Sequence, residues 1–398
     1  MKQSRAVAII RVCFVSLLAL FLVASLVLTL FFARENNEYE NRKANRVLPL
    51  TFGAFMNSSF QDSLESALSD QVPFAEGFKK AYNEADAYLS YNLLSATFAD
   101  NADRYFDFND VSVYNKDYLV YAPGAFSPTE KSGIDLKLGL LQKLVEKHPE
   151  LKFYAYYIER DCDLNFETLE KVGYAEYVEE KLPENIAFSK FEINNFDTYS
   201  KYFFKTDHHW NHKGSYKAYT ELLDLFETEE ILALGEEYLV GEGFVGSKLS
   251  AAKTDAFWGE DLYAYKFGFC DMKIYENGVE SADYGRQNGT ADAFLSSGEK
   301  LNYNAYYGAE NGETVFDTGR EGRENLLVIG ESYDNALLKQ LACHFNRTYS
   351  IDLRYYKHYM GEEFSFDAYV EQHGIDRVLF IGNVDFFVLD VFNLKAEG

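Results

Sequence analysis

Residues 326–341 read LLVIGESYDNALLKQL, a short apolar strand that ends at Gly330, followed by Ser332 and a helical pattern. Gly330 permits a tight turn at this junction. The first turn of a helix offers free backbone N–H groups that can stabilise a developing oxyanion. This strand–turn–helix context predicts an exposed nucleophilic hydroxyl at Ser332. The alternative is that Ser332 only caps the helix, because serine is a favoured N-cap residue.

Strand and helix patterns alternate through the rest of the C-terminal part of the chain. Apolar runs predict strands at 118–122, 151–158 and 377–382, and helical periodicity predicts helices at 136–147, at 166–181 and from residue 335. This alternation favours an α/β fold with a parallel sheet covered by helices on both faces. Residues 235–325 are instead rich in Gly, Asn and Tyr, with Asn-Gly pairs typical of hairpins, so we expect an antiparallel hairpin-rich insertion there.

A long uncharged segment lies near the N-terminus. The residues from Val12 to Phe32 are mostly apolar, and at about 1.5 Å per residue they can cross a hydrocarbon core of about 30 Å. Lys2, Arg5 and Arg11 precede the segment, which favours a cytoplasmic N-terminus. The alternative is a cleaved secretory signal, but no A-x-A site precedes Arg34. We therefore expect an uncleaved single-pass anchor in the cell membrane and an extracytoplasmic C-terminal part.

These signals predict three regions. Residues 1–33 form the cytoplasmic N-terminus and the transmembrane anchor, and residues 34–99 form a polar connector with a helical stalk. Residues 100–398 form the α/β domain, which contains the insertion at 235–325. The stalk is predicted from apolar residues that recur every four positions near Leu64.

Composition excludes several classes of protein. The 398 residues are 47% hydrophobic and 25% charged, which fits a globular protein and not a disordered or coiled-coil one. The 63 acidic and 38 basic residues give a net charge of -25, which repels nucleic acid, so no nucleic-acid partner is expected. The cysteines Cys13, Cys162, Cys270 and Cys343 include no CxxC pair, which argues against a zinc ribbon or a disulfide scaffold.

A second motif, KTDHHWNHKGSYKAYTELLDLF, occupies residues 205–226. Its second half has the pattern of an amphipathic helix, which places the aspartate and histidines in the loop before that helix. In D-x-H spacing, a carboxylate can orient an imidazole and stabilise the imidazolium that forms when the ring accepts a proton. We therefore predict Asp207 as the orienting acid and His209 as the general base. With Ser332 they complete a catalytic triad.

The remaining histidines of this motif have other interpretations. Solvation or local capping is the simpler explanation for His208 and His212. A metal site built from Asp207, His208, His209 and His212 is a further alternative, because imidazole and carboxylate bind zinc and iron. The spacing is not H-E-x-x-H, and no distant ligand cluster accompanies it, so we expect no metal.

Together the two motifs resemble a known family. TDHHWNHKGSYKAY from Thr206 and VIGESYDNA from Val328 resemble the DHHW family and, more widely, SGNH-hydrolase-like acetyltransferases typified by the alginate O-acetylation proteins of the bacterial cell envelope. The YENR segment at Tyr39 and the ALSDQVPF segment at Ala67 are similar to segments of the same group. The resemblance implies an SGNH-hydrolase-like parallel sheet. As in the alginate-type relatives, the D-x-H motif here precedes the serine.

The resemblance also implies roles for individual residues. Asp207 and His209 correspond to the acid and the base, and Ser332 to the acyl-carrying nucleophile. The nucleophile motif more commonly reads GDS, and Glu331 here replaces its aspartate. The glycine and asparagine sequence blocks of SGNH hydrolases that contribute to the oxyanion hole are not clearly recognisable. Candidate substrate contacts are Trp210, Arg354 and Asn383, and the alternative for the last two is a structural role.

The leading functional hypothesis is transfer of an acyl group, with acetyl expected, to hydroxyls of an extracytoplasmic polysaccharide through an acyl-serine. The mechanism needs no metal or soluble cofactor, and the resemblance implies a membrane-bound partner that delivers acyl groups. One alternative is a carbohydrate esterase with the same triad, and another is a noncatalytic polysaccharide-binding assembly protein. Tyrosines of the insertion are available to stack on sugar rings in a groove, and the alternative is that they only stabilise hairpins. Examples are Tyr263, Tyr265, Tyr303, Tyr306 and Tyr307.

Overall fold

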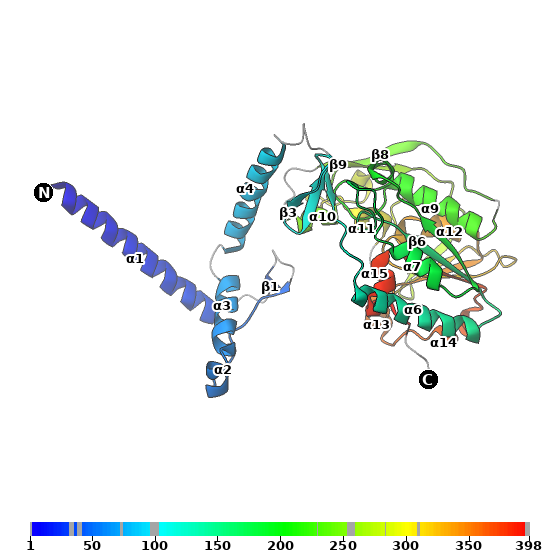
Figure 1. The fold of residues 1–398 in the computed structure, drawn as a ribbon, viewed down its shortest axis with the longest axis horizontal. Helices are drawn as coiled ribbons and strands as arrows, with labels where there is room; N and C mark the ends of the chain where they lie inside the picture. The colour runs from blue at the N-terminus through cyan, green and yellow to red at the C-terminus, as the bar shows by residue number, and fades with distance from the viewer. Residues whose placement is uncertain are drawn as a thin grey trace. The chain divides into compact units, whose positions relative to one another are not determined.

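The protein forms two compact units, Met1–Tyr91 and Asn92–Gly398. The structure is a computed structural model, and it describes residues 2–31, 36–37, 42–71, 75–95, 103–228, 230–252, 259–282, 284–308 and 311–394 (Figure 1). Residues 39–41 of the YENR segment and residues 72–74 of the ALSDQVPF segment lie outside the described residues.

The first unit is mainly helical. Its described elements are α1 (Lys2–Phe31), β1 (Asn36–Asn37), β2 (Arg42–Lys43), α2 (Phe52–Met56), α3 (Ser59–Gln71) and most of α4 (Ala75–Ser95). Within α1, residues Ile10–Val27 have a mean hydropathy of 2.5, which is apolar enough to cross a membrane. One apolar N-terminal helix of this kind fits a signal sequence as well as a single anchor. The helical periodicity of the predicted stalk corresponds to α3 and α4.

An eight-stranded mixed sheet forms the centre of the second unit. Its strands are parallel from β14 to β7 and antiparallel from β11 to β14. The predicted α/β class is confirmed, with a sheet that is mixed where we expected a parallel one. In spatial order the strands are β11 (Val279–Ser281), β10 (Lys273–Glu276), β12 (Glu313–Asp317), β14 (Arg347–Ile351), β13 (Leu326–Ile329), β15 (Arg377–Gly382), β6 (Lys152–Ile158) and β7 (Ile186–Phe191).

Both faces of this sheet are buried, because successive side chains of each central strand point into different cores. In β13, Leu326 and Val328 enter one core, and Leu327 and Ile329 enter the other. Helices that contribute to the first core are α8 (Phe196–Tyr202), α9 (His212–Leu225), α11 (Tyr303–Tyr307) and α12 (Leu338–Ala342). Helices that contribute to the second are α6 (Pro128–Lys147), α7 (Tyr174–Lys181), α13 (Leu353–Met360), α14 (Phe366–His373) and α15 (Val384–Val388).

Two sequence expectations for this unit are corrected. The run at 118–122 does form a strand, β5 (Tyr118–Val120), but it pairs antiparallel with β4 (Val111–Tyr114), which pairs with β3 (Phe106–Phe108) in a separate sheet. The helix predicted at 166–181 begins only at α7, because Leu164 and Lys171 form a β-bridge around the preceding turn. Strand propensity does not identify a strand's partner, and apolar periodicity does not detect such a turn.

The region at 235–325 contains the expected antiparallel pairs. Strands β8 (Glu237–Phe244) and β9 (Glu260–Tyr265) pair with each other, and α10 (Ser247–Ala251) lies between them in sequence. β10 and β11 form a hairpin whose turn, Asn277-Gly278, has positive φ at both residues, as a two-residue hairpin requires. β10 to β12 extend the central sheet. The short 3₁₀ helices are η1 (Ala291–Ala293), η2 (Asp334–Ala336) and η3 (Asp390–Phe392).

Candidate active site

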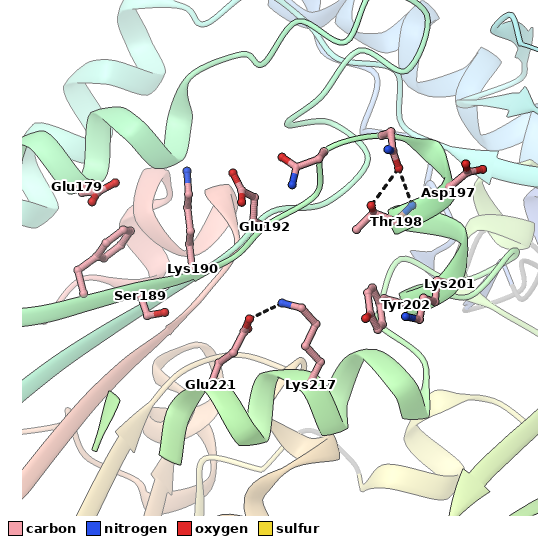
Figure 2. Close-up of a pocket in the computed structure, with 13 residues that line it drawn as sticks. Glu179, Ser189, Lys190, Glu192, Asp197, Thr198, Lys201, Tyr202, Lys217 and Glu221 are labelled. Atoms are coloured by element: carbon pink, nitrogen blue, oxygen red, sulfur yellow. Dashed lines mark hydrogen bonds and ion pairs between the residues drawn. The ribbon is translucent and has the colours of Figure 1, made fainter. Parts of the chain in front are cut away.

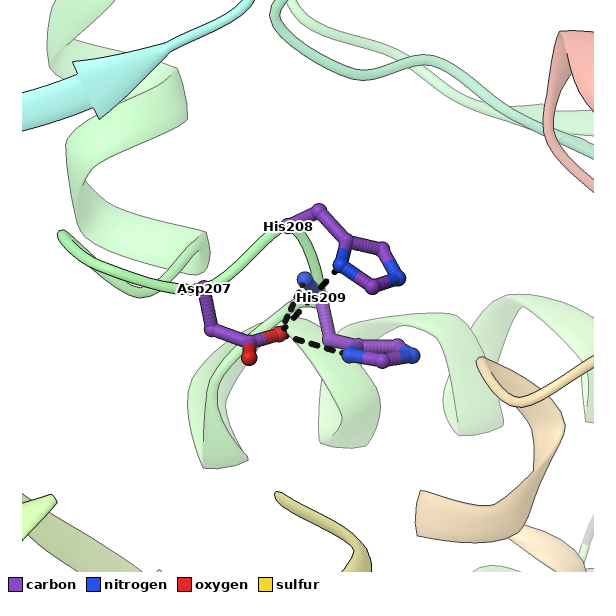
Figure 3. A group of neighbouring side chains, drawn as sticks. All are labelled: Asp207, His208 and His209. Carbon is purple, nitrogen blue, oxygen red and sulfur yellow. Dashed lines mark hydrogen bonds and ion pairs between the residues drawn. The ribbon is translucent and has the colours of Figure 1, made fainter. Parts of the chain in front are cut away.

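Asp207, His209 and Ser332 form a continuous hydrogen-bonded series. His209 Nδ1 lies 2.6 Å from Asp207 Oδ1, and His209 Nε2 lies 2.8 Å from Ser332 Oγ. Figure 3 shows the carboxylate directed at the near nitrogen of the His209 ring. The side chains of Asp207 and His209 are only 3% and 5% exposed. This order of hydroxyl, imidazole and carboxylate is the one that a serine nucleophile needs for activation.

The local backbone fixes the carboxylate. Asp207 Oδ1 also accepts the backbone N–H of His209 at 2.9 Å, and Oδ2 accepts the backbone N–H of Ser247 at 2.7 Å. Burial would raise the pKa of Asp207, but its interactions with His209 outweigh burial and hold the pKa below the ordinary range. Asp207 is therefore an anion under neutral conditions, and it can stabilise a protonated His209.

Ser332 lies at the carboxyl end of β13, in the turn before η2. Its side chain does not cap a helix, since Tyr333 and Leu337 occupy the N-cap positions of η2 and α12 and neither helix has a side-chain cap. In the described part of the chain, the only hydrogen-bond partner of Ser332 Oγ is His209. The capping alternative for Ser332 therefore has no support in this geometry.

The adjacent Glu331 is hydrogen-bonded to the loop after β15. Its Oε1 accepts the backbone N–H of Asn383 at 2.9 Å. Burial raises the pKa of Glu331 to about 7, although the Asn383 N–H and nearby Arg160 oppose the rise. Where the commoner motif GDS has an aspartate, this chain thus has a buried carboxyl that is hydrogen-bonded to the loop after β15 and lines a small cavity together with Ser332.

His208 points to a different partner from His209. Its Nδ1 lies 2.6 Å from Ser247 Oγ, and 27% of its side chain is exposed. Burial of the ring and the neighbouring His209 lower the pKa of His208. His208 is thus neutral near pH 7 and has no contact with the Ser332 hydroxyl among the described residues.

His212 starts α9, and its Nε2 lies 2.6 Å from Glu237. It is therefore not part of the group formed by Asp207, His208 and His209. The potential metal-ligating atoms of that group lie within 4.8 Å of one another. A metal bound there would compete for the His209 nitrogens that face Asp207 and Ser332.

Two of the three predicted substrate contacts, Trp210 and Asn383, have side chains with packing or capping roles. Trp210 is fully buried in the core beside Phe191 and Tyr333, so its indole does not line an open site. The Asn383 side chain caps α15 by accepting the Asp385 N–H at 2.7 Å. The resemblance suggested these residues as substrate contacts, but the sequence did not indicate where their side chains point.

Arg354 is the predicted contact that lies nearest to an opening. It pairs with Asp352 through Nη2 at 2.6 Å, and it lines a small cavity together with Ser332, Asn335 and Ser350. The cavity has room for about 20 Å³, little more than one water molecule needs. A larger cavity, of about 700 Å³, lies elsewhere, between β7, α8 and α9 (Figure 2). Its lining includes Lys190, Tyr202 and Lys217 but no member of the triad.

Sequence reasoning missed the residues that hold the loop containing Asp207 and His209. Glu260 of β9 accepts the backbone N–H groups of Lys205 and Thr206 at 3.0 and 2.8 Å, and the Thr206 hydroxyl at 2.6 Å. Burial raises the pKa of Glu260, although these donors oppose the rise. No motif marks this carboxylate, because its partners are backbone groups more than fifty positions away.

Gly246 lies where the insertion meets the loop containing Asp207 and His209, and it has no room for a side chain. A Cβ at this position would lie 2.1 Å from Thr206 O and 2.4 Å from Asp207 N, with backbone atoms that cannot move independently. We expect Gly246→Ala to displace Asp207, lowering ester hydrolysis by roughly 100-fold and stability by about 1–3 kcal/mol. Aryl acetate hydrolysis and thermal melting would measure the two effects. Gly268→Ala is the control, since nothing lies within 4 Å of its added Cβ; equal behaviour of the two variants would contradict the prediction.

Comparisons with known proteins identify a family that the chain resembles. A family model described as "DHHW protein" matches residues 176–351, a range that contains Asp207, His209 and Ser332. The predicted resemblance to the DHHW family is confirmed. No curated protein sequence gives a significant match.

Solved structures share the fold at low sequence identity. PatB1 from Bacillus cereus is 21% identical with a TM-score of 0.55, over 70% of this chain and 97% of that one. PatB1 with a sulfonyl adduct is 19% identical with a TM-score of 0.56, over 74% and 100%. A DHHW family protein from Eubacterium siraeum is 16% identical with a TM-score of 0.54, over 74% and 98%. These similarities establish the fold alone.

Proposed function

We propose that this chain, a DHHW family protein, transfers an acyl group to hydroxyls of a cell-envelope polysaccharide through an acyl-Ser332 intermediate. The observation that carries the proposal is the series from Ser332 Oγ through His209 to Asp207, with both contacts at hydrogen-bonding distance. A serine that only stabilises a turn needs neither an imidazole at its hydroxyl nor a buried carboxylate behind the ring.

The geometry supports a two-step reaction. His209 Nε2 accepts the proton of Ser332 as Oγ attacks the carbonyl carbon of a donor ester, and the donor alcohol leaves with that proton. His209 then takes the proton of an acceptor sugar hydroxyl, whose oxygen attacks the acyl-serine carbonyl. The acyl–Oγ bond breaks, and the proton returns to Ser332. Asp207 stabilises the imidazolium in both steps.

Two donors can stabilise the oxyanion that forms in each step. The backbone N–H of Ser332 has no acceptor within the described chain, and Asn335 lines the same small cavity. The Tyr284 hydroxyl donates to Asn335 Oδ1 at 3.0 Å, which leaves the amide Nδ2 as the end without a described acceptor. A preorganised donor of this kind contributes about 2.7–4 kcal/mol to transition-state stabilisation.

The acyl group and the partners are further parts of the proposal. The small cavity beside Ser332 favours a short acyl group such as acetyl. The apolar helix α1 fits an uncleaved single-pass anchor that keeps residues 100–398 outside the cytoplasm. Outside the cytoplasm acyl donors are scarce, so we propose a membrane-bound partner that supplies them and a polysaccharide that accepts them.

An acyl-transfer assay with the full-length protein in detergent tests this function. We expect an aryl acetate with cello-, chito- and xylo-oligosaccharides to yield acetylated sugar in mass spectrometry, and chelators to leave the rate unchanged. Release of acetate without any acetylated sugar would instead favour the esterase. Loss of activity on chelation, restored by a transition metal, would favour the metal site.

Sulfonyl labelling provides a second measurement. PatB1 forms a sulfonyl adduct, and we expect a sulfonyl fluoride to modify this chain at Ser332. Ser200→Ala is the control, because Ser200 Oγ donates to the Asp197 carbonyl within α8 and does not line this cavity, so its loss should not change the labelling. A protein that neither labels nor turns over an ester would support the noncatalytic alternative.

A further inference from the structure

Tyr303, which sequence reasoning proposed as a sugar-stacking residue, has a different contact in the structure. It is 2% exposed, so no sugar ring can lie against it in this arrangement. Its ring stacks on His209 with centroids 3.7 Å apart and planes 6° from parallel. The insertion therefore supplies an aromatic surface to the candidate base.

The hydroxyl of the same side chain reaches the nucleophile. Tyr303 Oη donates to the backbone carbonyl of Ser332 at 3.0 Å. The chain separates His209 from Ser332 by 123 positions, yet one tyrosine contacts the ring of the first and the backbone of the second. These two contacts constrain the distance between Nε2 and Oγ.

Tyr303 is itself firmly held. It begins α11, where the Asn302 side chain caps the helix by accepting the Ala305 N–H at 2.9 Å. Its ring also packs on Tyr307, with centroids 4.8 Å apart. A residue fixed in this way can position its neighbours, because its own movement would disrupt the core.

The stacking geometry also suits the reaction. The face of an aromatic ring attracts a cation more strongly than a neutral group. When His209 accepts the Ser332 proton, the resulting imidazolium lies against the Tyr303 face while Asp207 faces its other nitrogen. Tyr303 thus stabilises the protonated form of the base.

We propose that Tyr303 is a positioning residue, which aligns His209 with Ser332 and stabilises the imidazolium formed during acyl transfer. The proposal rests on the function proposed above, but it concerns the activation of Ser332 and does not depend on the identity of the acceptor. It also assigns the insertion a role in assembling the triad.

Two substitutions separate the two contacts. Tyr303→Phe keeps the stacked ring and loses the hydroxyl, so we expect kcat to fall by roughly 2- to 10-fold. Tyr303→Leu loses both contacts, and we expect kcat to fall by roughly 100-fold with KM for the aryl acetate unchanged. The matched control is Tyr306→Phe, since Tyr306 is buried in the same helix and its hydroxyl contacts Tyr238; this variant should retain the wild-type kcat.

The rate of sulfonyl fluoride labelling at Ser332 reports on activation without any acyl donor or sugar. We expect it to fall in the same order, with Tyr303→Phe retaining most of the rate that Tyr303→Leu loses. Wild-type labelling by a folded Tyr303→Leu protein, or a raised KM with unchanged kcat, would overturn the proposal. If Tyr303→Leu does not fold, labelling of Tyr303→Phe at the rate of Tyr306→Phe would overturn it. Slowed labelling in a protein that transfers no acetyl would uphold this inference while the proposed function fails.

Discussion

Ser332→Ala should lose ester turnover by at least roughly 1,000-fold, because the substitution removes the only atom that can carry the acyl group. The variant should remain folded. The deleted hydroxyl makes its one described side-chain hydrogen bond to His209 and does not cap a helix. Removing such a bond costs about 0.5–1.5 kcal/mol, so thermal melting should change by only a few degrees.

The control for this experiment is Ser200→Ala, a serine of helix α8 that does not line the cavity beside Ser332. Its turnover should match the wild-type value. Sulfonyl labelling should disappear from Ser332→Ala and persist in the control. Undiminished turnover by a folded Ser332→Ala protein would refute the nucleophile assignment.

His209→Ala should be almost as damaging, whereas His208→Ala should lower turnover by less than about 10-fold. His209 is hydrogen-bonded to both Ser332 and Asp207, so its removal abolishes proton transfer. Losses of about 1,000-fold or more are expected for a general base that acts in a triad. The His208 ring nitrogen Nδ1 is hydrogen-bonded to the Ser247 hydroxyl and lies 3.8 Å from Asp207 Oδ1, and His208 has no hydrogen bond to Ser332 among the described residues.

Melting curves of the two variants provide a further test. His209→Ala leaves the buried Asp207 carboxylate with its backbone donors but without the imidazole, which should cost about 1–3 kcal/mol. His208→Ala removes a partly exposed side chain, and its cost should be smaller. The opposite ranking of the two histidines, in turnover or in melting, would mean that the order of their roles is reversed.

The triad could be predicted from the sequence because its signals are local. Ser332 follows an apolar strand, and Asp207 and His209 lie two positions apart immediately before an amphipathic helix. Both contexts depend on a few neighbouring residues, and the structure brings the two motifs together. The α/β class was similarly accessible, because β6, β13 and β15 are apolar on both faces.

Residues that depend on distant contacts could not be predicted in this way. Trp210 adjoins the D-x-H motif, but its indole turns into the core. Tyr303 was one of several tyrosines in a Gly- and Tyr-rich region, and nothing in the sequence distinguished the ring that stacks on His209. In the sequence nothing distinguishes Glu260 from other acidic residues, because its role depends on the hydrogen bonds that it accepts from the distant Thr206.

The order of strands in the central sheet has a consequence for folding during synthesis. Among the described strands β15 is the last in sequence, yet it lies between β13 and β6 and pairs with both. Until β15 has been synthesised, no strand joins the part of the sheet that contains β13 to the part that contains β6. Pairing between segments that are distant in sequence is also slow. Because the chain is synthesised from its N-terminus, this sheet cannot be completed early. The sheet stays incomplete until these C-terminal residues are available, a delay that would suit the extracytoplasmic location proposed above, because export before completion of the sheet would avoid unfolding it.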